Sequence, residues 1–147
     1  MTRIRTYGTL LIVSLFAALC SAKSSNSKKS IVDEAVTAID ACYHWGGEVG
    51  DQSKERNEEI NKGVERDCPY AKEKAEKAYK LYPNNTVLAA KILELIDIGY
   101  FNVSDYEKKE ICEKATIHFR DEFLKSHQKD FLFLGMCPDQ ASKLYGQ

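Results

Sequence analysis

The most distinctive segment of this chain spans residues 42–48 and contains its single tryptophan. Trp45 lies beside His44, a Gly-Gly pair separates it from Glu48, and Asp51 follows three residues later. A tryptophan ring is a common anchor in protein interfaces, and acids nearby add charged contacts. One interpretation of the segment is therefore a protein-recognition loop.

The same segment has two other interpretations. In a catalytic one, His44 acts as a general base that Glu48 orients. In a structural one, Trp45 covers the core beside a disulfide, and a protonated His44 is favourable at the C-terminal end of a helix. The chain has no nucleophile elbow, Gly-rich phosphate loop or His-Glu-x-x-His motif, so we predict a non-enzymatic protein.

Charged residues downstream offer a second recognition element. Arg56, Glu59 and Arg66 would form an interface stripe or, alternatively, a solvated face of intrahelical charge pairs. The predicted partner-binding set comprises Trp45, Glu48, Asp51 and Arg56.

Four of the five cysteines, Cys42, Cys68, Cys112 and Cys137, follow the N-terminal segment that ends at Ala22. An even number of cysteines in an exported chain favours disulfides, and four allow three pairings. Sequential pairing closes two loops of similar length, so we favour Cys42–Cys68 with Cys112–Cys137. The absence of Cys-x-x-Cys and of ligand-like histidine spacing argues against a metal site, and we predict no cofactor.

Residues 1–22 have the pattern of a secretory signal peptide. Arg3 and Arg5 precede an apolar run over residues 9–19, and small side chains at Cys20 and Ala22 suit cleavage after Ala22. The apolar run is shorter than the roughly 20 residues of a membrane-spanning helix. We therefore expect a periplasmic or secreted protein without stable membrane insertion.

Composition places the rest of the chain among small globular domains. The 147 residues are 44% hydrophobic and 29% charged, which suits one domain. Beyond residue 22, 19 Lys and Arg face 22 Asp and Glu, a net charge of −3 that disfavours nucleic-acid binding. We expect a polar, disordered leader over residues 23–29 and a single helical domain over residues 30–147.

Apolar residues recur at helical spacing through most of this domain, and no stretch shows sustained strand alternation. Gly46 is expected to end the first helix, and Pro69 to begin the third. The expected helical segments are residues 31–45, 53–67, 69–82, 86–98, 104–126, 130–136 and 138–146, the last two being short. The predicted fold is an all-α, disulfide-stapled bundle of five to six helices.

Two resemblances extend this interpretation. The segment from Ala41 to Cys68, with its Cys-Tyr-His-Trp-Gly-Gly-Glu opening and the Glu-Arg-x-x-Glu-Ile run over residues 55–60, resembles small uncharacterised periplasmic proteins of proteobacteria. In size, export, helicity and cysteines, the mature chain resembles helical immunity proteins that neutralise type VI secretion effectors such as cell-wall amidases. The second resemblance implies a non-enzymatic inhibitor that docks on a toxin and forms a homodimer.

A different class provides the alternative. Insect odorant-binding proteins are also secreted, helical and stapled by cysteines, and this chain is similar only to their four-cysteine variants. Such a carrier of small apolar ligands needs an apolar cavity. Phe119, Phe123, Phe131 and Phe133 would line that cavity or, equally well, form the core.

Overall fold

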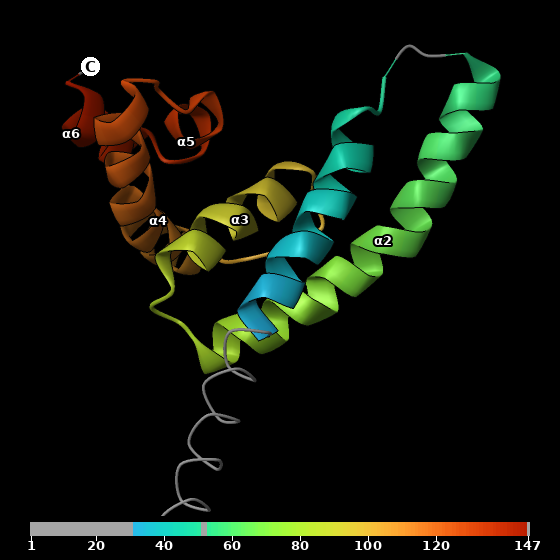
Figure 1. Cartoon of the computed structure of the whole chain (residues 1–147), viewed down its shortest axis with the longest axis horizontal. Coiled ribbons are helices and arrows are strands. Elements are labelled where there is room, and N and C mark those ends of the chain that lie inside the picture. The colour runs from blue at the N-terminus through green and yellow to red at the C-terminus, as the bar shows by residue number, and fades with distance from the viewer. Residues whose placement is uncertain (1–30, 51–52, 147) are drawn as a thin grey trace, which may run out of the picture. The chain divides into compact units, whose positions relative to one another are not determined.

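The domain is built from helices joined by short turns, and no strand occurs in residues 31–50 and 53–146, which the computed structural model describes (Figure 1). This confirms the all-α prediction. The predicted signal peptide, the leader and Asp51 lie outside the described residues. The helices cover residues 31–47, α2 Lys54–Leu81, α3 Thr86–Asp97, α4 Asp105–Ser126, α5 Phe131–Met136 and α6 Pro138–Tyr145.

The 31–47 helix and α2 form an antiparallel helical hairpin (Figure 1). The disulfide Cys42–Cys68 joins them, with Cα atoms 4.6 Å apart. The buried positions of both helices are mainly small, which permits close approach of the two backbones. These small residues are Ala35 and Ala38 on the first helix and Gly63, Ala71, Ala75 and Ala78 on α2.

Helix α2 runs without interruption through Pro69, which corrects the prediction of two helices at 53–67 and 69–82. Ser53 caps the helix as expected, because its side chain accepts a hydrogen bond from the Arg56 amide. A proline inside a helix removes one backbone hydrogen bond and costs about 3 kcal/mol. Here the buried positions continue at helical spacing from Ile60 to Ala78, and the disulfide at Cys68 holds the chain beside the proline.

The 31–47 helix ends at Gly47, one residue beyond the glycine that was predicted to end it. A Cβ atom at Gly46 would lie 2.7 Å from Cδ1 of Ile98, which follows α3. Gly46 therefore also permits close packing against Ile98 at this end of the helix. Gly99 has the left-handed conformation expected after a helix end, with φ of +77°.

Helix α3 contacts α2 on one side and α4 and α5 on the other. Most of its residues are apolar, and Leu88, Ile92, Leu93 and Leu95 are fully buried. Asn85 caps it by accepting a hydrogen bond from the Leu88 amide. The helix thereby supplies the centre of the core between the hairpin and the C-terminal helices.

The C-terminal helices pack through aromatic side chains. The rings of Phe119 and Phe133 lie 4.6 Å apart, and Phe123 contacts Tyr145 at 5.1 Å. Phe131 is 85% exposed and does not belong to this cluster. Three of the four phenylalanines thus pack around a common core, and they do not line one cavity together with Phe131.

The second disulfide, Cys112–Cys137, joins α4 to the start of α6. Both bonds match the predicted sequential pairing and are typical of an oxidising compartment.

The predicted start of α4 is confirmed, because Ser104 and Glu107 form a reciprocal capping box. Among the described helices, none is both long and apolar enough to cross a membrane.

Candidate functional site

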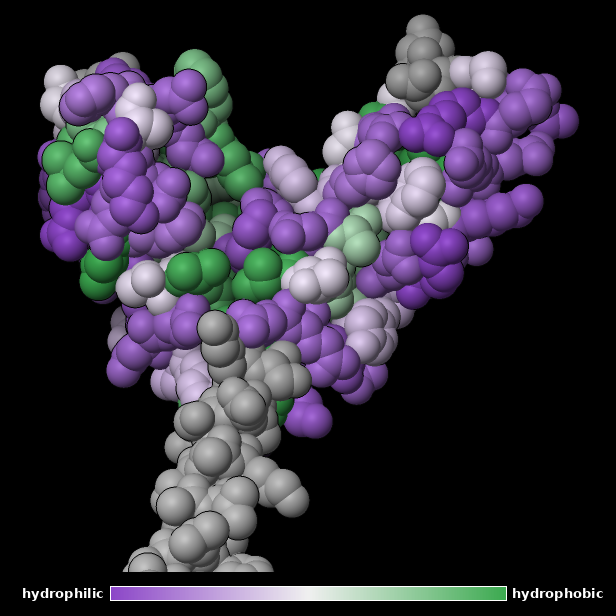
Figure 2. Space-filling view, in the orientation of Figure 1, coloured by the Kyte–Doolittle hydropathy of each residue, from purple (hydrophilic) through white to green (hydrophobic). Residues whose placement is uncertain are grey.

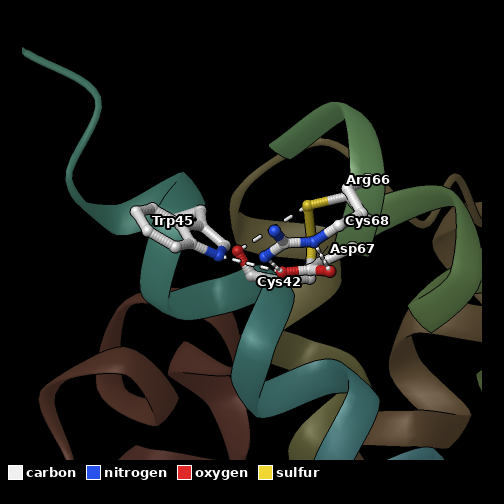
Figure 3. Close-up of a disulfide and its surroundings, with 5 residues drawn as sticks. All are labelled: Cys42, Trp45, Arg66, Asp67 and Cys68. Carbon is white, nitrogen blue, oxygen red and sulfur yellow. Dashed lines mark hydrogen bonds and ion pairs between the residues drawn. A yellow bond between two sulfur atoms is a disulfide. The ribbon is translucent and has the colours of Figure 1, made fainter. Parts of the chain in front are cut away.

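The Trp45 ring packs against α2 at Gly63. A Cβ atom at Gly63 would come within 2.3 Å of Cδ2 of the indole, so only glycine admits the ring in this position. The indole Nε1 donates a hydrogen bond of 2.9 Å to Oδ2 of Asp67 (Figure 3). The tryptophan is half-buried.

Asp67 is held from its other side by Arg66. The Arg66 Nε and Nη2 atoms donate hydrogen bonds of 2.7 Å to the two carboxylate oxygens (Figure 3). This pairing, assisted by the Trp45 indole, holds the pKa of Asp67 below its ordinary value, although partial burial acts in the opposite direction. The carboxylate that orients Trp45 therefore stays ionised, one residue from the disulfide at Cys68.

Arg56 connects Trp45 to two acidic residues. Its guanidinium carbon lies 5.7 Å from the centre of the indole ring, within the range of a cation–π contact. The same guanidinium donates hydrogen bonds to Glu48 and, at 2.7 Å, to Glu59. The hydrogen bond from Arg56 keeps the pKa of Glu48 below its ordinary value.

We call His44, Trp45, Glu48, Arg56 and Glu59 the hairpin-tip surface, because they lie where the 31–47 helix and α2 are connected. Three of the four predicted partner-binding residues, Trp45, Glu48 and Arg56, come together here. The two acids expected to face a partner freely are not equivalent. Glu48 is already paired within the protein, and Asp51 lies outside the described residues.

His44 and Glu48 also form the pair that the catalytic interpretation requires. The His44 Nε2 and Glu48 Oε1 atoms are 3.3 Å apart, with the histidine largely exposed. The other oxygen of Glu48 is occupied by Arg56, and Cys42 nearby is oxidised in a disulfide. An oxidised cysteine has no thiolate to act as a nucleophile. The pair therefore resembles part of a charge network more than a catalytic dyad.

Sequence reasoning missed Gly63 and Asp67, which determine the position of Trp45. The favoured pairing of Cys42 with Cys68 contained a usable signal. It fixes the register of two antiparallel helices, and that register brings the residues after Cys42 opposite those before Cys68. Trp45 and Asp67 are such a pair.

A second charged cluster links the hairpin to α3. Lys91 donates hydrogen bonds to Asp40 at 2.6 Å and to Oε1 of Glu94 at 2.8 Å. The Glu94 side chain is only 16% exposed, and its Oε2 atom has no hydrogen-bond partner among the described residues. Burial raises the pKa of Glu94 above its ordinary value. We assign this cluster a role in joining the helices.

The described surface also has a cavity of about 330 Å³ between the C-terminal end of α2 and the start of α4. Tyr79, Phe101, Val103 and Ile111 supply its apolar lining, and Glu76, Lys80 and Glu110 supply charges. No group of three or more His, Cys, Asp or Glu side chains suited to a metal ion occurs within the described ranges. The mixed apolar and charged lining of the cavity suits a small, partly apolar group.

No family model, no curated protein and no solved structure matches this chain.

Proposed function

We propose that the protein is an exported, non-enzymatic binding protein that recognises another protein through the hairpin-tip surface. The observation that carries this proposal is the fixed arrangement of Trp45 and Arg56. Both residue types dominate binding energy in protein interfaces. Trp45 is held by Gly63 and Asp67, and Arg56 by Glu48 and Glu59, beside a disulfide. Side chains ordered before binding lose less conformational entropy when a partner docks.

The expected partner is a toxin or cell-wall-degrading effector, which this protein would neutralise as an immunity protein or inhibitor. The resemblance in size, export, helicity and disulfides supports this role. The mixed charges of Glu48 and Arg56 fit a partner cleft that offers both an acidic and a basic group.

The test uses purified, oxidised protein and the purified products of the genes adjacent to its own, with binding measured by surface plasmon resonance. Glu48→Lys combined with Arg56→Glu retains an ion pair inside the protein but inverts the charges that a partner meets. The swap also removes the contacts of Arg56 with Glu59 and the Trp45 ring, so we expect a loss of stability of up to about 1 kcal/mol and at least about a tenfold loss of affinity. Lys72→Glu, an exposed change elsewhere on α2, is the control and should bind as the wild type does. Equal affinity of the swap and the wild type would refute recognition through this pair.

The cavity between α2 and α4 favours a second candidate function, the carriage of a small ligand. Its volume of about 330 Å³ is at the lower end of ligand pockets, which span about 300–1,000 Å³. An apolar fluorescent probe such as N-phenyl-1-naphthylamine tests this function by titration. Val103→Trp fills the cavity and should abolish probe binding if the carrier function holds. Identical titrations of the wild type and this variant would contradict it.

A further inference from the structure

Helix α4 carries a second apolar stripe on the side opposite its core contacts. Ile111, Cys112, Ala115 and Phe119 are buried against the rest of the protein. Tyr106, Ile117 and Leu124, by contrast, are 77%, 44% and 64% exposed. None of the elements that the structure describes covers these three side chains. Figure 2 likewise shows hydrophobic patches among hydrophilic side chains over α4 to α6, whereas the surface over α2 is mostly hydrophilic.

The exposed stripe belongs to a regular seam. Positions 106, 110, 113, 117, 120 and 124 alternate by four and three residues, the spacing by which one helix presents a continuous face to another. The seam residues are Tyr106, Glu110, Glu113, Ile117, Arg120 and Leu124. Its two ends are thus apolar, its N-terminal half is acidic, and Arg120 lies in its C-terminal half.

This order makes the seam complementary to itself. When two copies of α4 run antiparallel about a two-fold axis near residue 115, positions equally distant from that point face each other. Tyr106 then faces Leu124 of the second copy, and Glu110 faces Arg120 of the second copy. A two-fold axis repeats each contact, so the interface gains two apolar contacts at its ends and two ion pairs between them.

We propose that the exposed face of α4 is a homodimer interface, in which α4 packs antiparallel against α4 of a second copy. Glu113 faces Ile117 of the second copy, where we expect its methylene groups to contact the isoleucine and its carboxylate to reach solvent. The charges of Glu110 and Arg120 select this occupant, since a parallel arrangement in the same register would oppose like charges. The proposal does not depend on the function of the hairpin-tip surface.

The interface is small, so we expect weak association. A single pair of helices buries less than the roughly 1,200–2,000 Å² of a standard interface, which suggests a dissociation constant on the order of 10–100 µM. Because the ion pairs lie near solvent, added salt should weaken the dimer. Sedimentation equilibrium of the full mature protein, from low micromolar concentration to about 0.5 mM, measures this association.

Charge reversal provides the sharp test. Glu110→Arg and Arg120→Glu each place like charges opposite one another twice, so each variant alone should dimerise at least about tenfold more weakly than the wild type. An equimolar mixture of the two variants restores opposite charges at both contacts. We therefore expect the mixture to form a heterodimer with an affinity close to that of the wild type. Lys72→Glu on α2 is the control and should leave the dimer unchanged.

Thermal melts of each variant verify that the fold survives, because Glu110 and Arg120 also pair within α4 with Lys114 and Asp121. A wild type that remains monomeric over the whole concentration range would overturn the proposal. So would single variants that dimerise as the wild type does. If both single variants are monomeric and folded but their mixture is monomeric too, the antiparallel arrangement is wrong.

Discussion

The two disulfide-bonded regions of this protein differ in how the surrounding residues pack. Cys42–Cys68 and Cys112–Cys137 span almost equal lengths of chain, 26 and 25 residues. The first bond joins two helices whose buried residues are mostly alanine and glycine. The second bond lies beside a cluster of aromatic rings that includes Phe119 and Phe133.

Two disulfide loops of nearly the same length are thus surrounded by cores of different composition. In the hairpin, small side chains permit close backbones, and polar contacts such as Trp45 to Asp67 and Lys74 to Glu34 fix the register. In the C-terminal region, large aromatic side chains fill the space between α4, α5 and α6. Truncation of a buried side chain should therefore lower stability most in the C-terminal region, and enlargement of a buried side chain should lower it in the hairpin.

The largest expected effect is in the aromatic region. Phe133 is fully buried, so Phe133→Ala should lower the free energy of unfolding by about 3–5 kcal/mol through lost burial and the cavity left behind. Phe131→Ala, at an exposed position two residues earlier, is the matched control and should change stability by less than about 0.5 kcal/mol. Urea denaturation measures both. Equal losses would show that the aromatic cluster does not support this region.

Removal of either disulfide should have the next largest effect. Because the loops are of nearly equal length, the chain-entropy account predicts a loss of about 3 kcal/mol for each of two double variants, Cys42→Ala with Cys68→Ala and Cys112→Ala with Cys137→Ala. The measurement is urea denaturation of both variants under identical conditions. A difference between them of more than about 2 kcal/mol would mean that local packing, and not loop entropy, dominates.

Enlargement of a small residue should destabilise the hairpin. Gly63→Ala forces the Trp45 ring away from α2 and should cost about 1–3 kcal/mol. Gly47 has no neighbouring atom within 4 Å of an added Cβ, so Gly47→Ala should be neutral or stabilise by up to about 1 kcal/mol. Since Trp45 is the single tryptophan, its fluorescence reports on this region alone. An unchanged emission spectrum in Gly63→Ala would contradict the close contact.

The smallest effect concerns the link between the hairpin and α3. Burial raises the pKa of Glu94 above its ordinary value of 4.5, so the unfolded chain releases this proton at lower pH than the folded protein does. The stability that protonated Glu94 contributes is complete below about pH 4.5 and is lost as the pH rises through the raised pKa.

Glu94→Gln cannot titrate, and it should therefore flatten the decline in stability with pH above about 4.5. Thermal melts between about pH 4 and pH 8 measure the slope. Glu113→Gln, on the exposed face of α4, is the control and should retain the parent slope. Identical slopes for the parent and Glu94→Gln would show that Glu94 does not couple folding to pH.

Local signals in the sequence predicted most of the fold. Ser53, Ser104 and Gly99 have the capping or terminating roles expected of them, and the disulfide pairing that loop lengths favoured is the one observed. The main error is at Pro69. There a residue that usually interrupts a helix is tolerated because of contacts with distant parts of the chain, which local patterns do not contain.

The candidate site shows the same limit. Trp45, Glu48 and Arg56 stood out by residue type, and they do lie together. Their partners Gly63 and Asp67 are ordinary residues of a charged helix, and only the paired register of the two helices gives them a role. The burial of Glu94 was missed for the same reason, because it results from the packing of α3 against other helices and has no local signal in the sequence.

The order of the four cysteines also bears on how the protein matures. The two covalent loops follow one another along the chain and do not interleave. During synthesis, Cys42 and Cys68 both leave the ribosome before Cys112 does. Once the predicted signal peptide, with Cys20, has been removed, a thiol oxidant that joins the remaining cysteines in the order of their emergence would yield the native bonds directly.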